Sequence, residues 1–323
     1  MTIEIKHIVL SGGNVWGFNM IGILAEAIDT GFLKMENIRT IFGTSIGALV
    51  GLAISLKIDP ILLRDYFVKR PWDTLCKNNR YSVLELYDGR GILRQGFIED
   101  LFDPLLKSVD LSCATTLAEL YEYNGIEIHI YATELNRYEL VDISFKTHPE
   151  WRVVDAIYAS CSIPLLFSPL IHEDKCYIDG GFFLNYPITQ CPTENLNEVL
   201  GISMGNFSDD HIDIPITLAS TLPDIIFTSI MKTIQRSHLF TNNNTLPFPY
   251  QIILYNKVSL EYFMEVLYNQ GERERLTTEG KTIFQKYYIS WVGNQGYYAP
   301  TLDPGRVGKA DTCRGTRREK EGS

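Results

Sequence analysis

The sequence lacks any apolar run of the roughly 18 residues that a membrane-spanning helix needs. Its first residues carry Lys6 and His7 within a short apolar stretch, which is not typical of a secretory signal. Basic residues are also under-represented: 29 Lys and Arg against 39 Asp and Glu give a net charge of −10. This balance argues against a nucleic acid partner, because phosphate binding needs a clustered positive surface.

Cysteine and histidine are few and scattered. The six cysteines have no CxxC or framework spacing, and the six histidines form no HExxH motif or pair at helical spacing. Zinc sites and a disulfide scaffold therefore lack support, and we expect no metal or other cofactor. A reducing, cytoplasmic location, free or peripheral at membranes, is the simpler interpretation.

In the first part of the chain, a strand followed by a glycine turn and then a helix is predicted twice. Residues 7–10 predict a buried strand, residues 11–14 a tight loop, and the apolar spacing after Gly17 a helix. A second strand at 40–42 is followed by a glycine turn and a helix over 46–54. This order is typical of an α/β fold with a parallel sheet covered by helices.

The rest of the chain continues the α/β pattern up to a polar end. Residues 59–125 are predicted to be mainly helical. Further strands are predicted at 126–132, 139–145, 176–178 and 199–203, and helices at 151–159 and 216–240, the last interrupted at Pro223. No repeat or linker is evident, so we expect one domain over 1–300 and a disordered basic tail over 301–323.

Gly43-Thr44-Ser45-Ile46-Gly47 is a G-x-S-x-G segment between a predicted strand and a predicted helix. This is the sequence pattern of a nucleophile elbow, in which the serine occupies a tight, strained turn. Glycines flank the serine because side chains there would collide with neighbouring backbone. The Ser45 hydroxyl then lies at a helix amino terminus, where the dipole favours a developing negative charge.

A glycine loop, Ser11-Gly12-Gly13-Asn14-Val15-Trp16-Gly17, precedes the elbow. Consecutive backbone N–H groups in such a loop stabilise the oxyanion of an ester under attack. A phosphate-binding loop is the alternative, but the G-x-G-x-x-G spacing and a Walker lysine are both absent. Two loops that follow neighbouring parallel strands share one crevice, so we expect this loop to lie beside Ser45.

A serine nucleophile needs a base, and the histidines offer little. Only His211 and His238 follow Asp179 in the chain, and neither lies in a turn signature. Asp179-Gly180-Gly181 ends an apolar strand and is a candidate, although an Asp-Gly pair also makes an ordinary β-turn. From these residues alone, an ordinary β-turn is the favoured interpretation of Asp179.

Four segments, taken in order, resemble the patatin-like phospholipase family. They are the glycine loop at 11–17, the elbow at 43–47, residues 159–164 with Phe167 and Pro169, and residues 179–181 with Asn185 and Pro187. The resemblance implies a three-layer α/β/α fold with a mostly parallel central sheet. It also implies a Ser-Asp dyad that releases fatty acyl groups from phospholipids or acylglycerols without a metal, and a lipid or membrane surface as the partner.

The resemblance assigns roles to individual residues. Ser45 would be the nucleophile and Asp179 the base. The oxyanion hole would be formed by the backbone N–H groups of Gly12, Gly13, Asn14 and Ile46, and the motifs would be supported by Gly43, Gly47, Gly180 and Gly181. The loop departs from the family pattern at Asn14, in place of a glycine, and at Trp16, in place of Arg or Lys. Asn tolerates a left-handed backbone, but the missing cation predicts weaker phospholipase activity.

Two other hypotheses compete with the lipid hydrolase. The altered loop favours a non-enzymatic protein of the same fold that binds or stores acyl lipids. A histidine-dependent α/β-hydrolase would instead require His211 or His238. Finally, residues 224–240 carry an apolar stripe beside Lys232 and Arg236. It is compatible with a membrane-surface helix, but we expect it to pack on the sheet.

Overall fold

The computed structural model describes residues 4–82, 85–192, 195–205, 216–242, 248–255 and 259–293. The predicted tail at 301–323 and His211 lie outside these residues. The strands are β1 His7–Leu10, β2 Thr40–Thr44, β3 Gly91–Leu93, β4 Glu127–Glu134, β5 Glu139–Ile143, β6 Leu165–Phe167, β7 Leu170–His172, β8 Lys175–Asp179, β9 Val199–Met204 and β10 Tyr250–Leu254.

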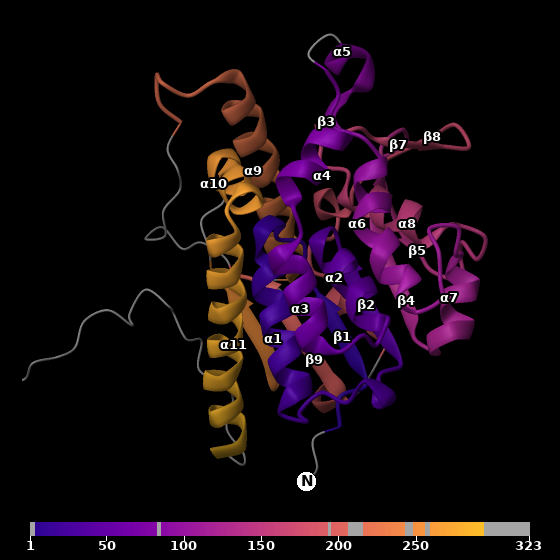
Figure 1. The fold of residues 1–323 in the computed structure, drawn as a ribbon, viewed down its shortest axis with the longest axis vertical. Helices are drawn as coiled ribbons and strands as arrows, with labels where there is room; N and C mark the ends of the chain where they lie inside the picture. Colours follow the sequence, from indigo (N-terminus) through magenta and orange to yellow (C-terminus); the bar gives the residue numbers. More distant parts are fainter. Residues whose placement is uncertain are drawn as a thin grey trace, which may run out of the picture.

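Helices surround these strands (Figure 1). They are α1 Gly17–Asp29, α2 Ile46–Ser55, α3 Pro60–Lys69, α4 Trp72–Asn79, α5 Leu86–Gly89, α6 Gly96–Lys107, α7 Leu117–Asn124, α8 Val153–Cys161, α9 Leu222–Asn242, α10 Leu260–Tyr268 and α11 Gln270–Gly293. Short 3-10 helices include η3 Gly180–Phe182 and η4 Pro187–Gln190. No helix among the described residues is long and apolar enough to cross a membrane.

The main sheet has the strand order β10-β9-β1-β2-β4-β8-β7, with β5 also paired to β4. Strands β10, β9, β1, β2 and β4 are mutually parallel, and β5, β8 and β7 are added in antiparallel pairs. The predicted α/β fold with a mostly parallel central sheet flanked by helices is thus confirmed. Both predicted strand-turn-helix units are present, as β1 with α1 and β2 with α2.

Alternate residues of the central strands enter two cores, as the two-residue period of a strand requires. Ile8 and Ile41 belong to the large core on the side of α1 and α2. Val9 and Phe42 face the other side, where the chain around η4 covers them. The residues that cover them, Leu184, Tyr186 and Ile188, belong to the chain that follows Asp179.

Helix α11, which the sequence did not lead us to predict, packs along α1 (Figure 1). The two helices approach closely at glycines: a Cβ on Gly22 would lie 2.0 Å from the Thr277 carbonyl oxygen, and one on Gly280 would lie 2.1 Å from that of Asn19. Helix α9 also differs from the prediction. It begins at Leu222, and Pro223 lies in its first turn, where the missing N–H costs nothing, rather than interrupting it.

Candidate active site

The β2–α2 junction has the geometry of a nucleophile elbow. Ser45 stands between the strand and the helix with φ 54° and ψ −126°, a left-handed conformation that is strained for a residue with a side chain. A Cβ on Gly47 would lie 2.4 Å from the Leu10 carbonyl oxygen, and one on Gly43 would lie 2.6 Å from the Ala48 backbone. The predicted reason for both glycines, collision with neighbouring backbone, is therefore confirmed.

Ser160, which the sequence analysis did not single out, fixes this strained turn. The Ser45 N–H donates a hydrogen bond to Ser160 Oγ at 2.8 Å, and the Ser160 hydroxyl donates to the Tyr131 carbonyl at 2.6 Å. Ser160 is fully buried on α8, so these bonds are shielded from water. The only sequence signal was its place in the 159–164 segment.

The register of β4 brings Asp179 to the elbow. Tyr131 of β4 is paired with Thr44 of β2, and the next residue, Ala132, is paired with Asp179 of β8. The ends of β2 and β8 therefore meet on consecutive residues of one strand. Gly180 is required at this meeting point, because a Cβ there would lie 2.1 Å from the Tyr131 carbonyl oxygen.

Ser45 and Asp179 line one small pocket, which contains about 240 Å³ of empty space. Asp179 Oδ1 accepts a hydrogen bond from the Gly181 N–H at 2.7 Å, whereas its buried Oδ2 has no hydrogen-bond partner among the described residues. The Ser45 hydroxyl is near enough to lower the pKa of Asp179 but does not form a hydrogen bond of ordinary geometry with it. Catalytic hydrogen bonds are often long without substrate.

Burial changes the acidity of Asp179. Its side chain is 1% exposed, and the loss of hydration raises its pKa. The Ser45 hydroxyl and the Gly181 N–H lower the pKa by a smaller amount, so the net result is a pKa of about 6. A free aspartate, with a pKa of about 3.9, is a poor base at neutral pH. A pKa near 6 leaves Asp179 mostly ionised at pH 7 and better matched to removing a hydroxyl proton.

The glycine loop supplies fewer oxyanion donors than predicted. The Gly12 N–H donates to the Asn185 carbonyl at 2.9 Å, so the prediction of Gly12 as an oxyanion donor is wrong. Asn185 also holds the loop from its side chain, through a bond from Nδ2 to the Gly12 carbonyl at 3.3 Å. The N–H groups of Gly13, Asn14 and Ile46 make no hydrogen bond to other described residues, which leaves three candidate donors.

Both departures from the family loop have a structural account. Asn14 has φ 58°, the left-handed conformation expected for an Asn in place of a glycine. Trp16 is fully buried, and a Cβ on Gly13 would lie 2.7 Å from Trp16 Cε3. The indole thus packs beneath the loop rather than facing the pocket. No Lys or Arg lines this pocket among the described residues.

Cys161 lies beside Ser45 and Asp179. Burial raises the pKa of its thiol, the Asp179 charge raises it further, and the Ser45 hydroxyl lowers it. Because the thiolate is the reactive form of cysteine, Cys161 remains an inert thiol at neutral pH. Ser45 is therefore the better candidate nucleophile of the two.

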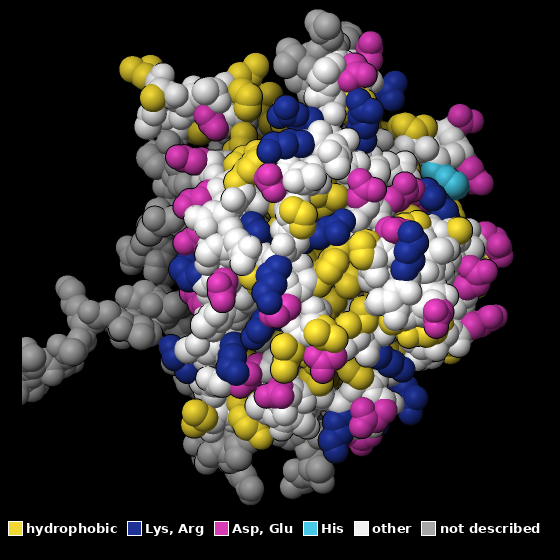
Figure 2. All heavy atoms as spheres, in the orientation of Figure 1, with side chains coloured by type: hydrophobic (Ala, Val, Ile, Leu, Met, Phe, Trp, Pro, Cys, Tyr) yellow, Lys and Arg dark blue, Asp and Glu magenta, His cyan; other side chains and the backbone are white. Residues whose placement is uncertain are grey.

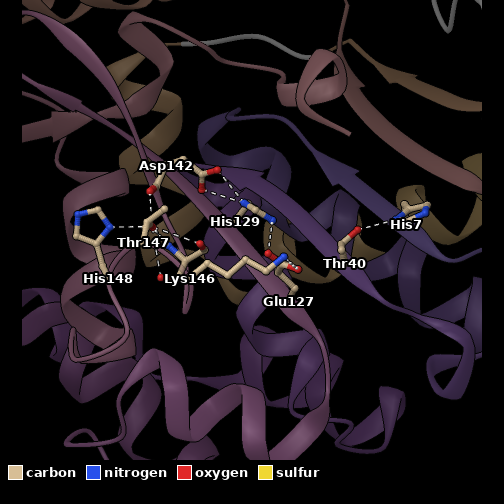
Figure 3. Close-up of polar contacts among 9 residues, drawn as sticks. His7, Thr40, Glu127, His129, Asp142, Lys146, Thr147 and His148 are labelled. Carbon is tan, nitrogen blue, oxygen red and sulfur yellow. Dashed lines mark hydrogen bonds and ion pairs between the residues drawn. The ribbon is translucent and has the colours of Figure 1, made fainter. Parts of the chain in front are cut away.

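The described histidines have other partners (Figure 3). His129 lies between Asp142, 2.8 Å from Nδ1, and Glu127, 3.1 Å from Nε2. His7 and His148 contact threonine hydroxyls, and His172 packs on Trp151. None of these bonds or ion pairs involves Ser45 or Asp179. His211 and the side chain of His238 lie outside the described residues. No group of three or more His, Cys, Asp or Glu in the described part could hold a metal ion.

Helix α9 covers the dyad. Met231 and Ile234 line the pocket with Ser45 and Asp179, and Phe227 is buried one turn earlier. The stripe was expected to pack on the sheet. These three side chains do pack inward, but α9 lies mainly against η3, the turn that follows Asp179, rather than on the main sheet. Ile225 and Ile226, by contrast, are exposed. Ser45 is only 6% exposed and Asp179 only 1% beneath this cover, so both side chains are shielded from bulk water.

The chain belongs to the patatin-like phospholipase family, whose model matches residues 8–192. It is 30% identical over 222 residues to the uncharacterized protein R571 of Acanthamoeba polyphaga mimivirus, covering 68% of this chain and 71% of that protein. It is 26% identical over 188 residues to the probable lipid hydrolase 463L of Invertebrate iridescent virus 6, covering 57% and 62%.

Among solved structures, VipD from Legionella pneumophila is similar with a TM-score of 0.49 and 15% identity, over 89% of this chain and 67% of that one. Membership of the family supports lipid hydrolase activity.

Proposed function

We propose that the protein is a carboxylic ester hydrolase that releases fatty acyl groups from phospholipids or acylglycerols through an acyl-enzyme on Ser45. The observation that carries the proposal is the meeting of Ser45, in its strained turn, with the buried carboxylate of Asp179. The relatives agree with it, since one is named a probable lipid hydrolase.

Acylation begins with Asp179. Its carboxylate takes the Ser45 hydroxyl proton as Oγ bonds to the ester carbonyl carbon. The carbonyl oxygen becomes an oxyanion, and the N–H groups of Gly13, Asn14 and Ile46 are placed to donate to it. When the tetrahedral intermediate collapses, the bond to the alcohol breaks and the alcohol leaves with the proton from Asp179.

Deacylation repeats these steps with water. Asp179 takes a proton from the water that attacks the acyl carbonyl, and the same N–H groups stabilise the second oxyanion. Collapse returns the proton to Ser45 Oγ and frees the fatty acid. Since Asp179 receives and returns one proton in each half-reaction, a base with a pKa of about 6 serves both.

The substrate meets the protein at a lipid surface in this proposal. Hydrophobic side chains lie at the upper left of the face in Figure 2, over the segment that leads into α9. Leu218, Leu222, Ile225 and Ile226 of this segment are all exposed. Such a patch favours insertion into an apolar interface. The inner face of the same helix covers the dyad. Docking of α9 on a lipid surface would therefore affect how the substrate reaches Ser45. A cytoplasmic setting agrees with the free thiols of the five described cysteines.

The test is release of fatty acid from mixed vesicles of phosphatidylcholine and diacylglycerol. Wild type, Ser45→Ala and Asp179→Asn are compared, with thermal unfolding to show that each variant is folded. The proposal predicts release by wild type and its loss in both variants. Full release by folded Ser45→Ala would exclude it. A folded wild type that binds lipid but releases nothing would favour the acyl-lipid-binding hypothesis, which the Asn14 and Trp16 departures motivated.

A further inference from the structure

A second cavity opens beside Ser45, and Asp179 does not line it. It contains about 730 Å³ of empty space and is almost entirely apolar. Helices α1, α2, α3, α4, α6 and α10 contribute side chains to it. Among the described residues that line it there is no charged side chain. An apolar lining of this kind suits a hydrocarbon ligand.

The two ends of this cavity differ. Asn14, Ser45 and Ile163 line both the cavity and the dyad pocket, so they mark its catalytic end. Phe67, Trp72 and Phe97 line the cavity alone, and they come from α3, α4 and α6, which contribute nothing to the dyad pocket. These aromatic side chains therefore form an aromatic end of the cavity, which shares no residue with the dyad pocket.

Trp72 is the centre of this aromatic end. Its ring packs against Phe18, Phe67 and Phe97, with centroids 5.7, 6.3 and 6.2 Å away. Its Nε1–H donates to the Phe67 carbonyl at 2.7 Å. The side chain is buried and held on several sides, so it does not move aside easily. An acyl chain that extends from Ser45 as far as this aromatic end therefore meets a fixed wall, formed by Trp72 and the rings packed around it.

We propose that this cavity binds the acyl chain of the ester and that Trp72 sets the longest chain that fits. The assignment of the bound chain as part of an ester rests on the function proposed above. Each methylene placed in the cavity improves binding about fourfold. Methylenes beyond the wall stay in water or force the cavity open, so the gain stops there.

Two substitutions move the wall in opposite directions. Trp72→Ala enlarges the aromatic end and is expected to extend the length limit, with about a 15-fold gain for a chain two methylenes beyond the wild-type limit. Val50→Phe places a ring in the cavity from α2 and is expected to shorten the limit. Trp72→Phe is a milder version if the alanine variant unfolds, since loss of a buried tryptophan is costly.

The experiment has two readouts. In the first, kcat/KM is measured for p-nitrophenyl esters from acetyl to palmitoyl, and the length profile of each variant is compared with wild type. In the second, saturated fatty acids of the same lengths displace a fluorescent fatty acid from Ser45→Ala protein carrying each wall substitution. Trp291→Ala is the matched control. This tryptophan packs on Phe32 and Tyr250, does not line the cavity, and its loss should keep the wild-type profile.

Opposite shifts of the length limit in the binding readout support the inference, whether or not the esters are hydrolysed. Hydrolysis with a profile that no wall substitution shifts overturns the inference and leaves the proposed function standing. Shifts in binding with no hydrolysis of any ester overturn the proposed function alone. A shift of the same size in Trp291→Ala also overturns the inference, because the effect would then be general loosening.

Discussion

The Ser45 N–H donates a hydrogen bond to the hydroxyl of Ser160, 115 residues further along the chain, at 2.8 Å. Ser160 passes this constraint to β4 through its bond to the Tyr131 carbonyl. The turn that presents the nucleophile is therefore tied to the strand whose next residue pairs with Asp179. In the proposed mechanism Ser160 is thus a positioning residue, which sets the place of Ser45 relative to Asp179.

Ser160→Ala is expected to lower kcat by up to roughly 10²-fold with little change in KM, because a small misplacement of the nucleophile slows attack. The measurement is steady-state hydrolysis of a short-chain ester. Ser162→Ala is the control: its hydroxyl is also buried and donates to a backbone carbonyl, that of Tyr158. Both variants lose about 1–3 kcal/mol of stability. Equal kcat values for the two would show that Ser160 is only structural.

The pH dependence of catalysis reports the ionisation of Asp179. Because only the carboxylate accepts the serine proton, kcat/KM is expected to rise through about pH 6 and level off above it. The measurement is the kcat/KM profile between pH 4 and 9 for a short-chain ester. A profile flat through pH 6, or one whose rise persists at full amplitude in Asp179→Asn, would contradict the assignment.

The same raised pKa predicts a gain in stability when the charge is removed. The folded protein holds the Asp179 proton up to about pH 6, whereas the unfolded chain releases it near pH 3.8. Wild type therefore loses stability as pH rises through this window, by about 3 kcal/mol in total. Denaturant unfolding should show Asp179→Asn more stable than wild type at pH 8 and not at pH 3.5. A pH-independent difference would rule out this origin.

Adding one methyl group at Gly12 is expected to lower the hydrolytic activity. A Cβ there would lie 2.3 Å from Asn185 Oδ1 and 3.3 Å from Ser45 Cβ, so Gly12→Ala displaces the loop from the nucleophile. We expect activity to fall roughly 10²-fold or more, since oxyanion donors move with the loop. Gly51→Ala is the control, because its Cβ meets Ile41 Cγ2 at 2.8 Å, away from the dyad pocket. Comparable loss in folded Gly51→Ala would refute the explanation.

The exposed patch before and within α9 predicts a lipid-binding phenotype. Leu222→Ser with Ile226→Ser removes two exposed apolar side chains and should weaken binding to vesicles without lowering the turnover of a soluble ester. Sedimentation with vesicles measures binding. Ile289→Ser is the matched control, because Ile289 is also exposed but lies on α11. Equal weakening by both changes would mean that any exposed apolar residue suffices.

The local part of the site could be predicted from sequence, and the part that depends on contacts distant in sequence could not. The elbow at 43–47 consists of consecutive residues, so it can be recognised from the local sequence: a strand, two glycines and a helix define the turn. By contrast, the Gly12 N–H donates its hydrogen bond to the Asn185 carbonyl, 173 positions further along the chain. No local sequence pattern encodes such a contact. The hydrogen bond of Ser160 to Ser45 and the cover formed by Met231 and Ile234 also join residues distant in sequence.

The fold shows the same division. The periodic units β1–α1 and β2–α2 were predictable from apolar spacing. The short strands β3, β6 and β7 have three residues each, too few for a period to appear. The docking of α11 on α1 rests on Gly22 and Gly280, whose meaning appears only when the two helices are side by side.

The most direct test of the central claim is to map the adduct of a fluorophosphonate probe by mass spectrometry of the digested protein. An activated serine beside a base reacts with such a probe, whereas an ordinary buried serine does not. A Ser45–Asp179 dyad predicts a single adduct on the peptide that contains Ser45, formed much more slowly in folded Asp179→Asn. An unmodified Ser45 in folded wild type, or labelling at the same rate in both proteins, would contradict a Ser45–Asp179 dyad.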